Sequence, residues 1–235
     1  LLGSPEGESP IAFQVGGSNP EVLFKATQLI SKYNFYEINL NLGCPSPKVQ
    51  SGNFGASLMY DSSLVLDCIN AMKDGIGNKV TQVTAKMRLG VDNQRIEETL
   101  PQFIESISVS GVQRIIIHAR IAMLKSLNPK ENRSIPPLDY NIVYQMKQKF
   151  SNLSIIVNGG LKTLDDCLKK LLWADGVMMG RSAYNSISQL NDVDSKIFGA
   201  TQKPKSIYDS LQLYRHYFES QLEKGIPFSS ISKHF

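Results

Sequence analysis

One cysteine, Cys44, occupies a stiff turn directly after a segment with the alternation of a β-strand. Residues 36–42 alternate apolar and polar side chains, and Gly43 and Pro45 flank the cysteine before a glycine-containing loop. In barrels and doubly wound α/β folds, reactive groups are placed at this carboxyl end of the strands. A lone cysteine is more often a small buried thiol, but this position favours a thiol that takes part in chemistry.

Every expected strand ends on a residue that can bind a ligand or react. Taken singly these residues have ordinary explanations, since a histidine can be a hydrogen-bonded core residue, a lysine can face solvent and paired glycines can form a turn. Because parallel strands bring their carboxyl ends to one edge, together they predict a single site. Besides Cys44, these residues are Gln14, Asn41, Lys86, His118, Asn158, Gly159, Gly160, Gly180 and Arg181.

The glycines at the last two strand ends predict a phosphate site. Gly159 and Gly160 follow one strand, and Gly180 with Arg181 follows the next. Barrels commonly bind phosphate there, through backbone N–H groups and the start of a helix. An arginine adds a charge-assisted contact that engages two phosphate oxygens. Gln14 and Lys86 are then expected to flank the body of a phosphorylated cofactor, where an ammonium can stabilise negative charge on a flavin ring.

Six strand candidates recur along the chain, and helical periodicity follows each of them. Such β-then-α units predict parallel strands joined by right-handed crossovers. The expected strands are residues 11–15, 36–42, 80–87, 114–118, 154–158 and 176–179. The expected helices begin at Asn19 and after Arg181, and cover residues 62–73, 95–108, 138–149, 163–172 and 207–222.

The first helix has the clearest start signal of the chain. Asn19, Pro20 and Glu21 supply a cap, a first-turn proline and an acidic residue in the order that helices use. The spacing of apolar residues predicts its buried face. That face is expected to contain Val22, Ala26, Leu29, Ile30 and Tyr33.

Polar faces on two strands favour a closed barrel over an open sheet. Glu37, Asn39 and Asn41 share one face of their strand, and Thr84, Lys86 and Arg88 share one face of the next. Parallel strands are usually apolar on both faces, whereas a barrel mouth accepts polar ends. The expected fold is α/β, a (β/α)8 TIM barrel of which six βα units are visible, with the other two expected before residue 1. Residues 1–200 are expected to form the barrel domain and residues 201–235 the start of a C-terminal helical domain.

Composition narrows the class of protein. The 235 residues are 42% hydrophobic and 20% charged, enough for a sizeable core, and no apolar run approaches the roughly 18 residues of a membrane span. Residues 1–4 carry no signal-peptide pattern. Three cysteines without a C-x-x-C pair predict reduced thiols and no metal site. We expect a monomer in the cytoplasm or an organelle, without a membrane partner.

A basic loop, residues 119–137, separates the fourth strand from its helix. Loops of this length are usually functional or mobile. From Arg120 to Arg133 it holds four basic residues and one acidic residue, and the net charge of the chain is +4. Both observations are compatible with an acidic partner such as RNA.

Three motifs carry a specific family resemblance. They are Asn-Leu-Gly-Cys-Pro-Ser at 41–46, Lys-Met-Arg-Leu-Gly at 86–90, and His-Ala-Arg at 118–120 with Leu-Asn-Pro-Lys-Glu-Asn-Arg at 127–133 and Ile-Pro-Pro-Leu-Asp-Tyr at 135–140. From about Pro10 to its end the chain resembles the tRNA-dihydrouridine synthases of the A subfamily. The resemblance implies an FMN-containing barrel with a small C-terminal helical domain, which reduces uridines in the tRNA D-loop with NADPH.

The resemblance also implies roles for individual residues. It implies that Cys44 is the general acid, which protonates C5 of the uracil when hydride reaches C6 from the reduced flavin. It implies that Asn41, Lys130 and Arg133 face tRNA. The positions that match the family's FMN contacts are Gln14, Lys86, His118, Asn158, Gly159, Gly160, Gly180 and Arg181.

The chain departs from the family pattern at both ends. The family's first two barrel strands and most of its helical domain have no counterpart in the sequence, so we expect a fragment whose activity belongs to the complete barrel. One alternative is a catalytically silent, truncated tRNA-binding remnant. Another is an FMN barrel that reduces free pyrimidines, although a free base needs no basic loop. The modified uridine is not identified by the sequence, because the docking of the tRNA determines it.

Overall fold

A computed structural model describes residues 10–33, 35–77, 80–202 and 205–232 of the chain. Residues 1–4, for which no signal peptide was predicted, lie outside the described residues, as do 203–204 and 233–235 of the expected helical domain. The chain divides into two compact units. The first contains the residues up to Gly160 together with Trp173–Met178, and the second contains Leu161–Leu172 and the residues from Met179 onward.

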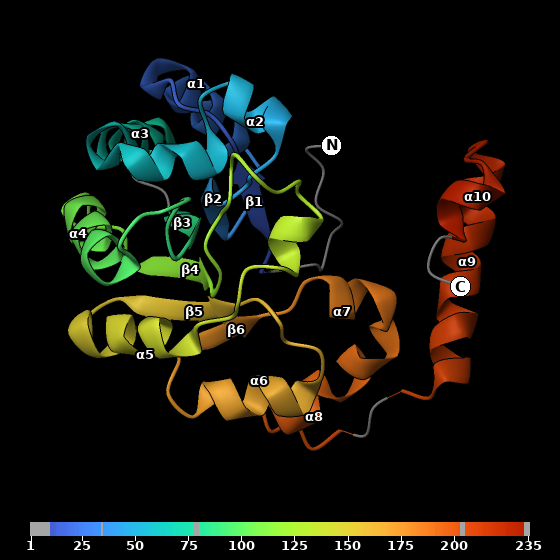
Figure 1. Ribbon diagram of the computed structural model, residues 1–235. Coiled ribbons are helices and arrows are strands. Elements are labelled where there is room, and N and C mark those ends of the chain that lie inside the picture. The colour runs from blue at the N-terminus through green and yellow to red at the C-terminus, as the bar shows by residue number, and fades with distance from the viewer. Residues whose placement is uncertain (1–9, 34, 78–79, 203–204, 233–235) are drawn as a thin grey trace. The chain divides into compact units, whose positions relative to one another are not determined.

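A six-stranded parallel sheet in sequential order, β1-β2-β3-β4-β5-β6, forms the centre of the first unit. In Figure 1 the first strands run almost vertically and the last ones almost horizontally, so the sheet curls across the view. The predicted α/β fold of TIM-barrel type is confirmed, as six parallel strands in a half-barrel. The strands are β1 (Ala12–Val15), β2 (Glu37–Leu42), β3 (Gln82–Arg88), β4 (Arg114–His118), β5 (Ser154–Asn158) and β6 (Gly176–Met178).

The two faces of the sheet differ sharply in polarity. One face carries residues such as Ile38, Leu40, Ile115 and Val157, all fully buried in the hydrophobic core. On the other face the register aligns polar residues of neighbouring strands into rows. The rows are Gln14, Asn39 and Thr84; then Asn41 and Lys86; then Arg88, His118 and Asn158. The alternation of each strand therefore separates core from site.

Helices of the first unit cover the apolar face, and α1, α3 and α4 lie along the same side of the sheet in Figure 1. Pro101 lies inside α4, in a helix whose buried face includes Leu100, Phe103 and Ile104. The helices and 3-10 turns of this unit are α1 (Pro20–Ile30), α2 (Pro47–Ser51), η1 (Gly55–Tyr60), α3 (Ser62–Ile76), α4 (Ile96–Ser108), η2 (Glu131–Arg133) and α5 (Tyr140–Lys149).

Helix α1 begins as predicted but buries a different face. The Asn19 side chain accepts a hydrogen bond from the N–H of Val22, as a helix cap does. The predicted face is wrong for Val22, Leu29 and Tyr33, which are exposed, Val22 to 61% and Leu29 to 49%, while Ala26 is half-buried and Ile30 is buried. The residues buried are Leu23, Thr27 and Ile30.

Thr27 explains this rotation of the helix. Its hydroxyl donates to the carbonyls of Leu23 and Phe24, so the polar group is satisfied inside the helix. A Cβ on Gly75 of α3 would lie 2.2 Å from the Thr27 hydroxyl and 2.5 Å from the Phe24 carbonyl oxygen. The two helices thus approach through small residues, a packing that counting apolar side chains does not detect.

The second unit is helical and is described by itself. Thr163 and Asp166 form a reciprocal capping box at the start of α6, and Ser182 of α7 donates to the carbonyl of Leu161. The Tyr214 hydroxyl of α9 donates to the carbonyl of Ile231. Its elements are α6 (Leu164–Leu171), α7 (Arg181–Asn185), η3 (Ile187–Asp192), α8 (Val193–Lys196), α9 (Ile207–Glu223) and α10 (Phe228–Ile231).

Candidate active site

The turn after β2 holds Cys44 through its backbone. The Asn41 side-chain oxygen accepts hydrogen bonds from the N–H groups of Gly43 and Cys44, both at 3.0 Å. The carbonyl of Cys44 accepts the N–H of Ala56 at 3.0 Å, which ties the turn to η1. The Cys44 thiol is half-buried, whereas Cys68 and Cys167 are fully buried in the core. Cys44 is therefore the accessible thiol of the described residues.

Lys86 lies beside this turn, because its backbone pairs with Asn41 in the register of β2 and β3. Within the described ranges, its ammonium has neither a hydrogen bond nor an ion pair. Burial, with a smaller contribution from Arg88, lowers the pKa of Lys86 from 10.5 to about 8. A largely buried cation of this kind is usually completed by an anionic or electron-rich partner.

Arg88, which was not predicted as a site residue, connects the cysteine turn to the basic loop. Its guanidinium donates to the carbonyls of Gly43 at 3.1 Å, Ile121 at 3.2 Å and Asn132 at 2.8 Å. Only 3% of Arg88 is exposed. Burial, with Arg120 and Arg133 adding repulsion, lowers the pKa of Arg88 to about 10. Arg88 therefore remains a cation at neutral pH.

The loop that carries Lys130 and Arg133 is folded around a buried amide. Asn132 is 0% exposed, and its side chain bonds to the backbone of Met123, Leu127 and Asn128. These bonds fix η2, on which Arg133 lies, while Lys130 directly precedes it and both side chains are at least partly exposed. The loop is thus a built element that presents its charges outward.

Asp92 provides a second attachment for the same loop. Its carboxylate accepts the N–H of Leu124 at 2.7 Å and the hydroxyl of Tyr60 at 3.0 Å. Asp92 has a φ of 47°, in the left-handed region that aspartate tolerates better than most residues. The segments after β2, β3 and β4 therefore meet at one carboxylate.

His118, Asn158 and Gly159 continue the site along the sheet edge. His118 and Asn158 pair in the register of β4 and β5, and the Asn158 amide donates to the carbonyl of Met178 at 2.7 Å. A Cβ on Gly159 would lie 2.3 Å from the His118 ring, and one on Gly160 2.4 Å from Leu138. Both glycines have positive φ, 101° and 71°. Protein side chains and backbone conformation therefore already require glycine at both positions.

Gly180 and Arg181 lie at the start of α7, in the second unit, and both are exposed. Their predicted role in a phosphate site with Gly159 and Gly160 stays a prediction. The other residues predicted from the sequence lie in the first unit, where Gln14, Asn41, Cys44 and Lys86 form a continuous group. Lys130 and Arg133 belong to the loop that Arg88 binds.

The electrostatic character of the site is cationic. Lys86 and Arg88 repel each other, and Arg120 and Arg133 contribute to the same field at Arg88. Both Lys86 and Arg88 also interact electrostatically with Cys44. The arrangement combines a thiol, a donor-rich turn and concentrated positive charge, which suits an anionic ligand and proton transfer to it.

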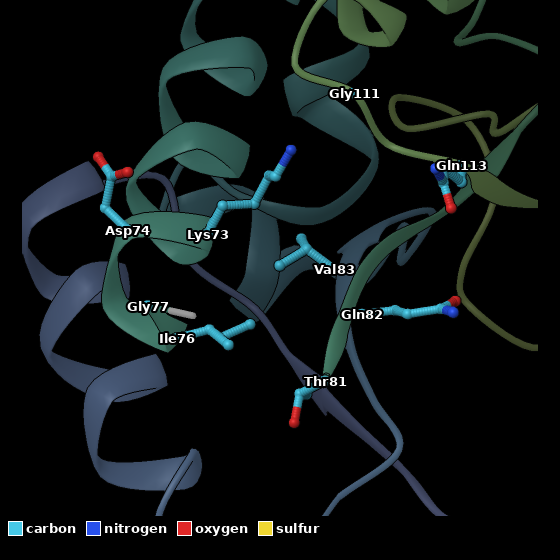
Figure 2. A pocket seen from close by; sticks show the side chains of 9 residues that line it. All are labelled: Lys73, Asp74, Ile76, Gly77, Thr81, Gln82, Val83, Gly111 and Gln113. Carbon is cyan, nitrogen blue, oxygen red and sulfur yellow. The ribbon is translucent and has the colours of Figure 1, made fainter. Parts of the chain in front are cut away.

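A pocket of about 460 Å³ lies elsewhere, at the amino end of β3 and the carboxyl end of α3 (Figure 2). Lys73 and Asp74 line it together with Thr81, Gln82 and Gln113. It contains none of the strand-end residues. Across the described part of the chain, no group of three or more His, Cys, Asp or Glu could hold a metal ion. No helix in that part is long and apolar enough to cross a bilayer.

Two solved structures share the fold. The chain is similar to a lyase/mutase-titled protein from Burkholderia cenocepacia, with a TM-score of 0.52, 13% identity and coverage of 87% of this chain and 69% of that one. It is also similar to a protein from Coccidioides immitis titled as dihydrodipicolinate synthase family, with a TM-score of 0.51, 9% identity and coverage of 82% and 58%. At these identities the likeness shows the barrel-type α/β fold alone.

The sequence defines the class more closely. It matches dihydrouridine synthase (Dus) over residues 2–235, and the chain belongs to this family. It is 46% identical over 235 residues to the tRNA-dihydrouridine(20/20a) synthase of Vibrio parahaemolyticus, covering 100% of this chain and 71% of that protein. It is 43% identical over 234 residues to the protein of the same name from Escherichia coli K12, covering 99% and 67%. The prediction that two βα units precede residue 1 stays a prediction.

Proposed function

We propose that the protein reduces uridine to 5,6-dihydrouridine in the D-loop of tRNA, with FMN as the bound cofactor and NADPH as its reductant. The observation that carries the proposal is the pairing of an accessible thiol, Cys44, with a largely buried ammonium, Lys86, at adjacent strand ends. Relatives at 41–46% identity named for positions 20 and 20a support these positions as the substrate.

The residues present fit a phosphorylated flavin. Lys86 has no hydrogen bond or ion pair within the described residues, and burial, with repulsion from Arg88, lowers its pKa to about 8. When bound, reduced flavin would supply the hydride for C6 of the uracil. We propose that Lys86 stabilises negative charge on the ring system, and that Gln14, His118 and Asn158 contact it. Gly159, Gly160, Gly180 and Arg181 are proposed to hold its phosphate.

Cys44 is proposed to supply the proton that completes the reduction. Saturating the C5–C6 double bond requires hydride at C6 and a proton at C5, and the S–H bond of Cys44 would break as the C5–H bond forms. A side chain with an S–H group suits this step because it can act as a general acid while the new C–H bond forms. The Asn41 cap would hold the thiol at the uracil edge while Asn41 itself faces the RNA.

Lys130 and Arg133 are proposed to bind the phosphate backbone of tRNA. Replacing both with alanine is expected to weaken tRNA binding about uniformly across sequences, and to reduce the salt slope by roughly 0.7 to 0.9 for each phosphate that the variant no longer neutralises. Fluorescence anisotropy at several salt concentrations measures both quantities. The matched control replaces Lys25 and Lys32, two exposed lysines of the α1 region. Equal affinities and slopes in the two double variants would contradict the assignment.

A substrate comparison tests the function itself. The protein, FMN and NADPH are incubated either with unmodified tRNA transcript or with free uracil, and mass spectrometry detects the addition of two hydrogens. We expect dihydrouridine in the tRNA and none in the free base. Turnover of free uracil alone would favour the pyrimidine-reducing alternative. Tight tRNA binding with flavin bound and no product would favour a silent tRNA-binding protein.

A further inference from the structure

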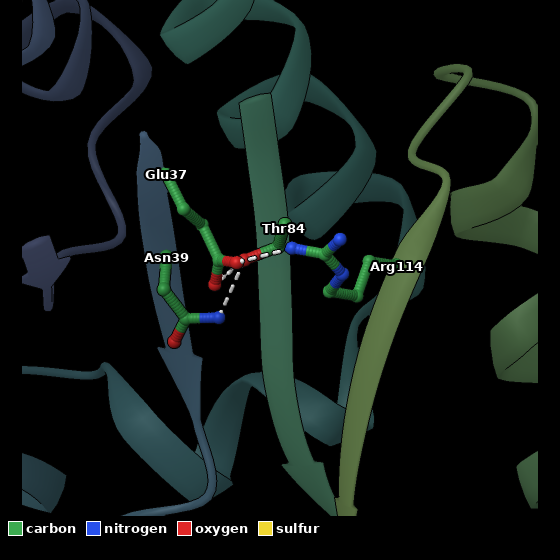
Figure 3. A network of polar contacts seen from close by, with 4 residues as sticks. All are labelled: Glu37, Asn39, Thr84 and Arg114. Atoms are coloured by element: carbon green, nitrogen blue, oxygen red, sulfur yellow. Dashed lines mark hydrogen bonds and ion pairs between the residues drawn. The ribbon is translucent and has the colours of Figure 1, made fainter. Parts of the chain in front are cut away.

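A continuous network of hydrogen-bonded side chains runs along the polar face of the sheet toward the cysteine turn. Figure 3 shows the first four residues, in which Glu37 and Asn39 extend from β2, Thr84 from the neighbouring β3 and Arg114 from β4, with dashed lines marking their contacts. Arg114 donates to Glu37 at 2.9 Å, Thr84 donates to Glu37 at 2.6 Å, and Asn39 donates to Thr84 at 2.7 Å. Thr84 is 0% and Asn39 3% exposed, so these bonds lie away from solvent.

The rest of this network reaches the turn of Cys44 at the carboxyl ends of the strands. Gln14 donates to the Asn39 oxygen at 2.8 Å, and Asn41 donates to the Gln14 oxygen at 3.0 Å. The Asn41 side-chain oxygen accepts hydrogen bonds from the N–H groups of Gly43 and Cys44. The connection is therefore continuous from the ion pair at the amino ends of the strands to the thiol-bearing turn at their carboxyl ends.

The groups at the two ends of this network fix which partner donates and which accepts in each of its hydrogen bonds. A carboxylate only accepts, so the Thr84 hydroxyl must donate to Glu37 and can only accept from Asn39. A backbone N–H only donates, so the Asn41 oxygen must face the turn. Each amide between them then has one orientation in which all its partners are complementary. Turning any one of them would bring like atoms together.

We propose that Thr84 and Asn39 are positioning residues: with Glu37 as the terminal acceptor they set the amide orientation of Gln14 and Asn41, and thereby the conformation of the Cys44 turn. This positioning stands on the bonds themselves, and only its consequence for catalysis rests on the proposed role of Cys44. Thr84 is the residue to test, because its single hydroxyl is the group that links the Glu37 carboxylate to the amide side chains.

The test compares Thr84→Val, which keeps the shape and removes the hydroxyl, with Thr84→Ser, which keeps the hydroxyl. The first readout is the rate of Cys44 alkylation by iodoacetamide at fixed pH, followed by peptide mapping. Because Cys68 and Cys167 are buried, their labelling reports unfolding in the same sample. We expect Thr84→Val to alkylate several-fold faster at Cys44 alone, since the turn loses its oriented cap, and Thr84→Ser to match the wild type.

The second readout is the kinetic split in dihydrouridine formation. Loss of positioning is expected to lower kcat about tenfold in Thr84→Val, with KM for tRNA nearly unchanged and flavin still bound. A folded Thr84→Val protein with Cys44 alkylation at or below the wild-type rate would overturn the proposal. If Thr84→Val labels the buried cysteines, Glu37→Gln replaces it in the same assays with the same expected result. An inactive wild type whose Thr84→Val variant still alkylates faster would contradict the proposed function and leave the positioning intact.

Discussion

Replacing Cys44 with alanine is expected to lower the rate of dihydrouridine formation by roughly 10²–10⁴-fold, the usual contribution of a general acid. The thiol is half-buried in a turn whose N–H groups are capped by Asn41, so the substitution removes only one small group. Bound flavin and its reduction by NADPH should persist, because neither requires a proton at C5 of the uracil. Anaerobic flavin bleaching and product analysis by mass spectrometry separate the two steps.

The control for this experiment is Cys167→Ala. Cys167 is a buried cysteine of α6, in the second unit, so its loss tests whether removing any thiol impairs the protein. We expect near wild-type turnover from this variant. Wild-type rates of dihydrouridine formation in Cys44→Ala would exclude the proton-donor role, and loss of flavin from that variant would indicate a binding role in its place.

Flavin binding is expected to weaken as the pH rises above about 8, the value to which burial lowers the Lys86 pKa. If the phosphorylated flavin binds more tightly to the ammonium form, Kd rises by up to about tenfold for each pH unit above this pKa, until the pH reaches the higher pKa that Lys86 has in the flavin complex. Titration of flavin fluorescence between pH 7 and pH 9.5 measures this slope. In Lys86→Met the affinity should be weaker at pH 7 and nearly independent of pH.

The same lowered pKa predicts that the flavin-free protein becomes more stable, not less, as the pH rises above about 8. The folded-state pKa of Lys86 lies below its unfolded value of 10.5, so the ammonium opposes folding below about pH 8, and this penalty fades between about pH 8 and 10.5. Lys86→Met should therefore raise the free energy of unfolding at neutral pH by up to about 3 kcal/mol, at 1.36 kcal/mol per pKa unit. Urea unfolding without flavin measures it. A variant that is both less stable and equally tight for flavin would show that Lys86 has a structural role only.

Much of the fold could be predicted because the alternation of apolar and polar residues marks the strands of the sheet in the sequence. The bounds predicted for β4 and β5 agree with the structure, and those of the other strands differ by one or two residues. The alternation of β2 and β3 was sufficient to place Asn41 and Lys86 on one face, where the register pairs them. Parallel topology followed from the repeated βα order, which leaves few alternatives.

The residues that were missed act through the backbone of distant segments. Arg88 binds three carbonyls from two loops, and Asn132 folds its loop around one amide. Nothing in the local sequence specifies which carbonyls a buried guanidinium will reach. A polar residue on the polar face of a strand, two positions after Lys86, was the available signal. The packing of Thr27 against Gly75 was missed for the same reason, since it depends on a second helix.

Arg88 has a consequence for how this protein could diversify. Its guanidinium donates hydrogen bonds to backbone carbonyls of the basic loop, at Ile121 and Asn132, and of the cysteine turn, at Gly43. A carbonyl is present whatever side chain accompanies it, so surface residues of the loop can be exchanged without loosening its attachment. Exposed residues such as Lys130 and Arg133 can therefore change while Arg88 keeps its bonds to both segments, so under the proposed function the strength of tRNA binding can evolve separately from the cysteine turn. One buried guanidinium therefore attaches the basic loop to the cysteine turn, independently of the side chains that the loop exposes.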